Sequence, residues 1–434
     1  MNPSPAPTRD AGLVDRWAGI AAGGFQILCA FGLWLIWSQW RDRENGDIPY
    51  YYGQLTGGVP IEQVMPEYPV PALWLLELPR LLIGSQGDQN DYRDVFVVLC
   101  FAALGGFSLL LWHRIAPQDR RAAAAGVICW AAFSTATGTV ILLRPDIAIA
   151  VLGGTAVLLG SSWPVLAGAL LALAGWLKIW PVVLAAGFLP GRGLIVRVLL
   201  GGFGTAVAVA VVVLVSAGWQ RMISPLTYQS DRGLQVESLW ATPLLLGRLA
   251  DPAAFPVRMT EWKAFEILGE GRDAALVLAN LGALGLTALV ALACWRSRPR
   301  TAADGRRPGF DQAAIAELAV LIVLAVLLAN KTFSPQYLSW LGPPLAIAVA
   351  RAVQTQRADR ALRWAAIGVA AAAATFVLYP FEYGGLVCGA TPEDVATPIH
   401  WLLLRNALLV ALFVDLTWCR LRTGQPALLR HRRR

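Results

Sequence analysis

The sequence predicts an all-α integral membrane protein, a polytopic bundle of roughly 10–13 membrane-spanning helices. Of its 434 residues, 56% are hydrophobic and only 15% are charged, which leaves too few polar side chains to cover a water-soluble protein of this size. Apolar runs of about 20 residues, the length of a helix that crosses a bilayer, recur along the whole chain. Lipid is therefore the expected environment of most of the protein.

The spans follow one another from the first apolar run onward. Residues 1–15 are polar and carry no cleavable signal pattern, so the apolar run that follows is expected to remain as a membrane anchor. Between Ile147 and Leu189, prolines break the chain into three shorter runs that predict short spans or helical hairpins. The clearest spans are Trp17 to Trp40, Val95 to Trp112, Ala122 to Leu143, Val196 to Gly218, Ala274 to Trp295, Ala313 to Ala329, Tyr337 to Ala350, Ala361 to Leu378 and Trp401 to Cys419.

Basic residues predict the orientation in the membrane. If the N-terminus is cytoplasmic and every candidate span crosses, 22 of the 36 Lys and Arg residues fall on the cytoplasmic side, where positive charge is expected. Residues 1–16 and the basic residues 421–434 are then cytoplasmic tails, and residues 17–420 form one transmembrane domain. Two external loops are long, residues 41–94 and 219–272. In the first, residues 61–83 mix apolar and charged side chains, which is typical of helices lying in the membrane interface.

Unusual polar sequences gather on the predicted outer side. A single cation at the end of a span is as often a headgroup anchor as a ligand, and this applies to Arg144 and Lys178 taken alone. Several cations and an isolated carboxylate on one side instead favour a site for an anionic, lipid-linked substrate, because charge near apolar runs is costly. These sequences are Gly46 to Tyr52, Glu67 to Pro71, Arg144 to Asp146, Lys178 to Pro181, Arg232 to Ser238, Lys331 to Tyr337 and Tyr379 to Tyr383.

Other functional classes are disfavoured. The net charge of +8 lies in short clusters between apolar runs, so the expected partner is the lipid bilayer and no nucleic acid. The six cysteines and three histidines show no metal-ligand spacing and no disulfide framework, and we expect no bound metal.

The outer sequences, together with Arg405-Asn406, resemble the polytopic GT-C glycosyltransferases of glycosyltransferase family 87, the actinobacterial mannosyltransferases that use polyprenol-phosphate-mannose. The likeness extends from Asp47 to Asn406. It departs at Tyr68-Pro69-Val70-Pro71, where family members commonly carry two adjacent prolines. The resemblance implies the GT-C fold, no cofactor, and transfer of mannose with inversion to a glycolipid or lipoglycan acceptor on the extracytoplasmic face of the plasma membrane.

The resemblance also implies residue roles. One carboxylate is sufficient as general base, because the phosphate leaves as an anion and needs no acid partner. Asp47, just after the first span, is the expected base, and Glu67 is the reserve candidate. The expected donor-phosphate ligands are Arg144, Lys178, Arg232 and Lys331. The expected sugar or acceptor contacts are Tyr50, Tyr51, Asp146, Gln235, Glu237, Gln336 and Tyr337.

Two alternatives remain open at this point. The same chemistry with polyprenol-phospho-arabinofuranose or polyprenol-phospho-glucose would leave the same signature. A lipid-linked-sugar flippase or transporter should carry ionisable groups near the middle of the membrane and often paired structural halves. Here the charges collect at one end of the spans, which favours an enzyme.

Overall fold

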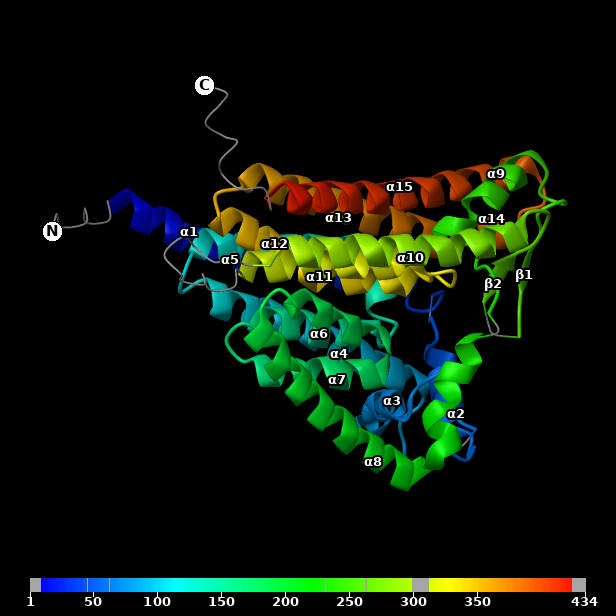
Figure 1. Ribbon diagram of the computed structural model, residues 1–434. Helices are drawn as coiled ribbons and strands as arrows, with labels where there is room; N and C mark the ends of the chain where they lie inside the picture. Colours follow the sequence, from blue (N-terminus) through cyan, green and yellow to red (C-terminus); the bar gives the residue numbers. More distant parts are fainter. Residues whose placement is uncertain are drawn as a thin grey trace.

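The computed structural model describes residues 9–44, 46–61, 63–230, 232–261, 264–298 and 312–423. These residues form a bundle of long helices, with shorter helices and one β-hairpin at one end (Figure 1). The predicted all-α polytopic bundle is confirmed, whereas the hairpin was not foreseen. Most of the predicted cytoplasmic tails, at residues 1–8 and 424–434, lies outside the described residues.

The first half of the chain alternates long and short helices. Asp88 begins α4 with a reciprocal capping box to Asp91, and Pro164 occupies the first position of α7, where its missing N–H costs nothing. The elements are α1 (Arg9–Trp40), α2 (Ile48–Thr56), α3 (Val70–Ile83), α4 (Gln89–Ile115), α5 (Arg120–Thr137), η1 (Gly138–Ile141), α6 (Asp146–Leu159), α7 (Pro164–Leu177) and η2 (Trp180–Phe188).

The second half begins with the longest helix and contains the hairpin. Strands β1 (Val257–Met259) and β2 (Phe265–Ile267) pair antiparallel, with Arg258 opposite Glu266. The helices are α8 (Arg192–Ser230), η3 (Leu239–Ala241), α9 (Thr242–Ala250), α10 (Arg272–Arg296), α11 (Gln312–Ala329), η4 (Pro335–Leu341), α12 (Gly342–Gln354), α13 (Ala358–Phe376), η5 (Val377–Glu382), α14 (Tyr383–Cys388) and α15 (Pro392–Thr423).

Helix lengths support a multi-pass membrane protein. Helices α6 and α7, of 14 residues each, occupy the stretch where the sequence predicts short spans. In α11, 83% of the residues are buried, so this helix lies in the centre of the bundle. Among the described residues, eight segments are long and apolar enough to cross a membrane: Trp17–Trp40, Gln89–Ile115, Arg120–Ile141, Arg192–Tyr228, Arg272–Arg296, Gln312–Ala329, Ala358–Cys388 and Pro392–Arg422.

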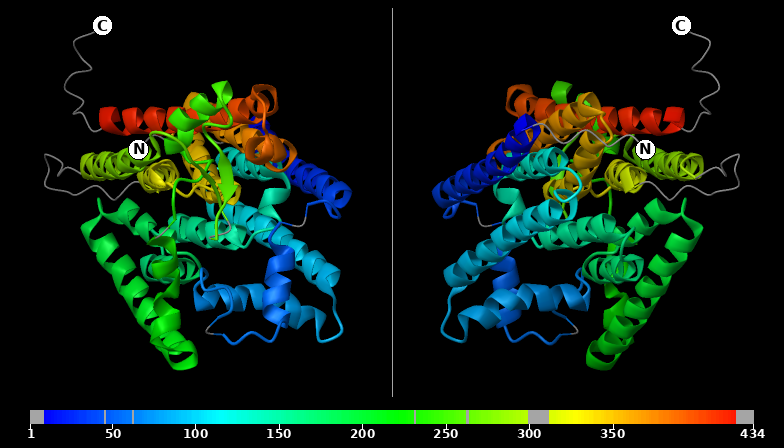
Figure 2. Two further views of the ribbon diagram at one scale, coloured as in Figure 1. Left: turned by 90° about the vertical axis from the view of Figure 1, so that its right-hand side faces the viewer. Right: turned by 90° about the vertical axis from the view of Figure 1, so that its left-hand side faces the viewer.

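The two ends of the bundle differ. The start of α1 and the end of α15 lie together at the left of Figure 1, whereas α2, α3, α9, α14 and the hairpin lie at the opposite end, here called the loop-rich end. Seen from that end, α2, α3 and α8 lie on one side of the molecule and the later helices on the other (Figure 2). The polar sequences singled out above meet here, because residues from each of them line two adjoining cavities described below.

Buried charged residues hold the loops of this end in place. Helix α8 is interrupted at Gly218, where the predicted span ends, and the buried Arg221 follows this interruption. Glu266 of β2 accepts a hydrogen bond from the Gly233 amide and pairs with Arg272 at 3.1 Å, which fixes the hairpin to the segment after α8. Arg221 donates to the main-chain carbonyls of Ile61, Val64, Met65 and Tyr68, the loop that carries Glu67.

Candidate active site

A cavity of about 510 Å³ opens at the loop-rich end and is called the cationic cavity. Among the described residues, three cations line it, Lys178, Arg232 and Lys331, together with the carboxylates Asp47 and Glu67. Other lining residues are Tyr50, Tyr68, Trp180, Tyr228, Gln336 and Tyr337. A pocket with this excess of cations under an aromatic wall is suited to an anionic group.

A second cavity, of about 280 Å³, adjoins the first and is called the acidic cavity. Carboxylates of Glu44, Asp47 and Glu237 line it, and Arg144 is the one cation among its lining residues in the described part of the chain. Its walls also include Val236, Met259, Phe265, Phe333, Tyr379 and Tyr383. The two cavities therefore differ in charge.

Four residues line both cavities: Asp47, Gln235, Ser334 and Gln336. Gln235 is 6% exposed, and its Oε1 has no hydrogen-bond partner among the described residues. A buried polar atom without a partner is costly and marks a position that a ligand can satisfy. Asp47 and Gln235 thus stand at the boundary where groups bound in the two cavities would meet.

The Asp47 carboxylate is held by a cation and a phenol. Its Oδ2 lies 3.0 Å from Nε of Arg144 and accepts a hydrogen bond from the Tyr51 hydroxyl at 3.2 Å. Because Tyr51 gives its one proton to Asp47, the Tyr68 hydroxyl donates to Tyr51 at 3.0 Å. Burial opposes the charge of Arg144, but the charge of Asp47 raises the pKa of this guanidinium above its usual value.

Glu67, the reserve base, is engaged by Tyr50, whose hydroxyl donates to Oε1 at 2.7 Å. Burial raises the pKa of Tyr50, and the hydrogen bond to Glu67 raises it further, so Tyr50 is a neutral donor. Both residues line the cationic cavity, whereas Glu67 does not line the acidic one. Of the two candidate bases, Asp47 alone faces both cavities.

Lys178 is held in a cage of one carboxylate and two aromatic rings. Its Nζ lies 2.8 Å from Oδ1 of Asp146 and 4.1 Å from the ring centroid of Tyr337. The indole of Trp340 donates to the same Asp146 oxygen at 2.7 Å and stacks on Trp180. The ammonium is thus fixed at the wall of the cationic cavity.

The other two cations come from two loops, one after α8 and one after α11. The guanidinium of Arg232 lies 5.8 Å from the ring centroid of Tyr228, at the end of α8. Lys331 follows α11, and its side chain makes no hydrogen bond or ion pair with another described residue. The main-chain carbonyl of Lys331 accepts a hydrogen bond from the main-chain N–H of Gln235 at 3.0 Å, so the two loops are joined directly.

Glu237 is buried in a network that continues into α15. Nη1 of Arg405, a fully buried side chain, donates to Oε2 of Glu237 at 2.7 Å, and Nη2 donates to the Glu237 carbonyl at 2.6 Å. The same guanidinium lies 4.2 Å from the ring centroid of Phe333, and Tyr383 also bonds to Glu237. Burial raises the pKa of Glu237, whereas Arg405 lowers it. Arg405 therefore ties both loops of the site to one helix.

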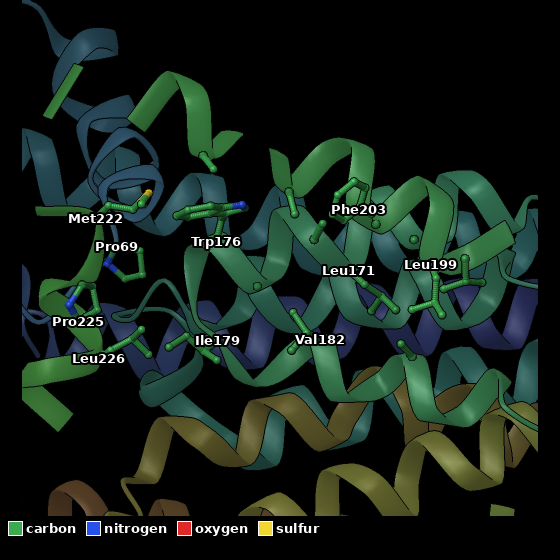
Figure 3. A pocket seen from close by; sticks show the side chains of 18 of the residues that line it. Pro69, Leu171, Trp176, Ile179, Val182, Leu199, Phe203, Met222, Pro225 and Leu226 are labelled. Atoms are coloured by element: carbon green, nitrogen blue, oxygen red, sulfur yellow. The ribbon is translucent and has the colours of Figure 1, made fainter. Parts of the chain in front are cut away.

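An apolar groove of about 760 Å³ leads away from the cationic cavity between α7, η2 and α8. It shares Pro69, Ile179 and Pro225 with that cavity. In Figure 3 these three residues lie at one end of the groove, and Leu199 and Phe203 lie toward the other. The groove is lined almost entirely by apolar side chains, so it suits a hydrocarbon chain.

Most residues singled out from the sequence line one of the two cavities. Arg144 lies apart from the other three expected phosphate ligands, beside Asp47 on the acidic cavity. Tyr51 and Asp146 line neither cavity and instead support Asp47 and Lys178 from behind. The sequence did not predict the roles of Glu44, Tyr68, Arg221 and Arg405. The partners of these residues lie elsewhere in the chain, so no local sequence pattern indicates them.

Comparison with known proteins identifies the family. The sequence model of glycosyltransferase family 87 matches residues 68–322, more than half of the chain. Searches among curated proteins and among solved structures find no match. Asp47 precedes the matched residues, which include Arg144, Lys178 and Gln235. The chain therefore belongs to glycosyltransferase family 87 and is a multi-pass membrane glycosyltransferase.

Proposed function

We propose that this glycosyltransferase transfers mannose from polyprenol-phosphate-mannose to a glycolipid or lipoglycan acceptor, with inversion at the anomeric carbon. The observation that carries the proposal is the position of Asp47 between the cationic and acidic cavities, with the apolar groove adjoining the first. A lipid-phosphate-sugar has a matching order of parts: hydrocarbon for the groove, phosphate for the cations and sugar at the boundary.

The step requires one base. The acceptor hydroxyl oxygen forms a bond to C1 of the mannose while the bond from C1 to the phosphate oxygen breaks, and its electron pair stays on the phosphate. The hydroxyl proton passes to the Asp47 carboxylate. Lys178, Arg232 and Lys331 stabilise the growing phosphate charge, and Arg144 orients Asp47 through their 3.0 Å contact. Gln235 hydrogen-bonds a sugar hydroxyl at the boundary.

The same proposal places the loop-rich end on the extracytoplasmic side of the plasma membrane. The start of α1 and the end of α15 share the opposite end, so the proposal puts both of them on the cytoplasmic side. Four arginines also lie around the turn between α12 and α13 at that end, as the positive-inside rule expects. They are Arg351 in the last turn of α12, Arg357 between the helices, and Arg360 and Arg363 in the first turns of α13.

The test is transfer of radiolabelled mannose from polyprenol-phosphate-mannose in membranes that contain the full chain or its Asp47→Asn variant at matched levels. We expect the variant to lose about 10²–10⁴-fold in rate, since a general base contributes this much. Asp42→Asn is the matched control, because Asp42 lies in the same loop with an 86% exposed side chain and lines neither cavity.

The other outcomes are equally informative. Full activity of Asp47→Asn together with loss in Glu67→Gln would move the base to Glu67. A folded wild type that ignores the mannose donor but uses the arabinofuranose or glucose donor would keep the mechanism and change the sugar. Failure with all three donors would contradict the proposal.

A further inference from the structure

The acidic cavity has a charge balance that restricts what it can hold. Among the described residues, its three carboxylates face one cation, and that cation, Arg144, is already paired with Asp47. Arg405, which lies behind Glu237, is likewise paired and has no exposed surface. An anionic group placed here would be repelled by the negative charge that these two cations leave unpaired.

Its walls offer an apolar face and a hydroxyl-binding edge. Phe265 and Met259 come from the hairpin, and Phe265 packs edge-on against Tyr383 with centroids 5.8 Å apart. Tyr379 donates its hydroxyl to Oε1 of Glu44 at 3.0 Å. A sugar ring presents C–H groups on its faces and hydroxyls around its rim, so it matches both kinds of wall.

We infer that the acidic cavity is the acceptor site, that it takes an uncharged sugar ring of the acceptor, and that Met259 and Phe265 of the hairpin determine which acceptor is used. The inference rests on the proposed function, and the attacking hydroxyl is the one that reaches Asp47 at the boundary with the cationic cavity. A volume of about 280 Å³ accommodates the reacting end of a glycolipid and leaves its phosphate and lipid outside.

The hairpin is suited to this role because strand β2 is anchored by buried contacts, whereas Met259 on strand β1 is exposed at the cavity. Glu266 of β2 is 4% exposed and bonded to Gly233 and Arg272, whereas Met259 of β1 is 57% exposed at the cavity. A side chain at position 259 can therefore change without loss of the anchoring contacts. Arg258, its exposed neighbour on β1, does not line the cavity and provides a matched control.

The test uses the full chain in membranes with labelled polyprenol-phosphate-mannose and two acceptor probes, octyl α-mannoside and its 6-phosphate. We expect the neutral probe to react at least about tenfold faster than the phosphorylated one. Met259→Trp should raise the KM for octyl α-mannoside about tenfold, because it fills the cavity mouth, while Arg258→Ala leaves this KM unchanged. In both variants, the rate at which water hydrolyses the donor to free mannose should equal the wild-type rate. The KM for the donor should also be unchanged.

Each contrary result has a distinct meaning. Equal use of the two probes, or an unchanged acceptor KM in Met259→Trp, would overturn the inference. So would a wild type that releases free mannose but transfers none to the neutral probe. A wild type that neither hydrolyses nor transfers any of the three sugars would instead contradict the proposed function, and the inference would fall with it.

Discussion

Nε of Arg144 lies 3.0 Å from Oδ2 of Asp47, although 97 positions separate the two residues in the chain. The pair places a nearly buried guanidinium, 11% exposed, against a carboxylate that is 40% exposed and faces two cavities. An ion pair of this kind orients the carboxylate without covering it. Under the proposed function, Arg144 is therefore a positioning residue for Asp47, and this role can be separated from phosphate binding by experiment.

Replacement of Arg144 by Gln should lower kcat about 10²-fold with little change in the donor KM, because Asp47 loses its orientation while the cationic cavity stays intact. Arg144→Lys should restore part of the rate. Transfer of labelled mannose at several donor concentrations separates the two parameters. Arg41→Ala, which removes a partly exposed ion pair with Asp94 away from both cavities, is the control. A rise in donor KM with unchanged kcat would mean that Arg144 binds the phosphate.

Gly46 is predicted to tolerate no side chain. Its φ of +56° is a conformation that favours glycine, and a Cβ there would overlap the Arg144 side chain. Gly46→Ala should therefore reduce kcat in the same way as Arg144→Gln, with the protein still extracted as a folded species. Gly53→Ala in α2 is the control, since a Cβ at Gly53 meets nothing within 4 Å. Wild-type kcat in Gly46→Ala would contradict the assigned pairing.

Lys331 and Lys178 should behave differently although both line the cationic cavity. Lys331→Gln should raise the donor KM about tenfold without loss of stability, because its side chain has no partner among the described residues. Lys178→Gln should also destabilise the protein, since it leaves the buried Asp146 without its cation. Donor titrations and thermal unfolding in detergent measure the two effects. Equal loss of stability in both variants would refute this distinction.

The pair of Arg405 and Glu237 should stabilise the site more than any exposed ion pair. Arg405→Leu and Glu237→Leu each leave a buried charge without its partner, which costs about 3–5 kcal/mol and should lower the unfolding temperature clearly. The double variant removes both charges and should unfold at a higher temperature than either single variant. Calorimetry of the three purified proteins tests this. Additive losses in the double variant would show that the two residues act independently.

The apolar groove should discriminate donors by chain length. Ala206 lies in the groove on α8, and Ala206→Trp fills it. We expect transfer from a full-length polyprenol donor to fall at least about tenfold, with a smaller loss for a donor whose short chain does not enter the groove. Ala208→Trp, on the exposed face of the same helix and outside the groove, is the control. Equal losses for both donors would place the lipid chain elsewhere.

The helical class and most span positions follow from local sequence. An apolar run of about 20 residues can satisfy its backbone in lipid only as a helix, so segments such as Trp17–Trp40 need no tertiary information. The predicted span from Val196 to Gly218 ends where helix α8 is interrupted, because non-helical backbone cannot satisfy its hydrogen bonds in lipid. The hairpin was missed because its strands have three residues each and pair through contacts that no periodic pattern announces.

The sequence by itself determined that charged and aromatic residues gather at one end of a membrane bundle, since hydropathy and charge bias are properties of short segments. Tertiary structure alone decided their pairing. It placed Arg144 beside Asp47, Lys178 on Asp146 and Glu237 on Arg405, which lie 97, 32 and 168 positions apart. Residues so far apart in the sequence become partners only when the helices pack, because a buried charge is stable only beside an opposite charge in the folded protein.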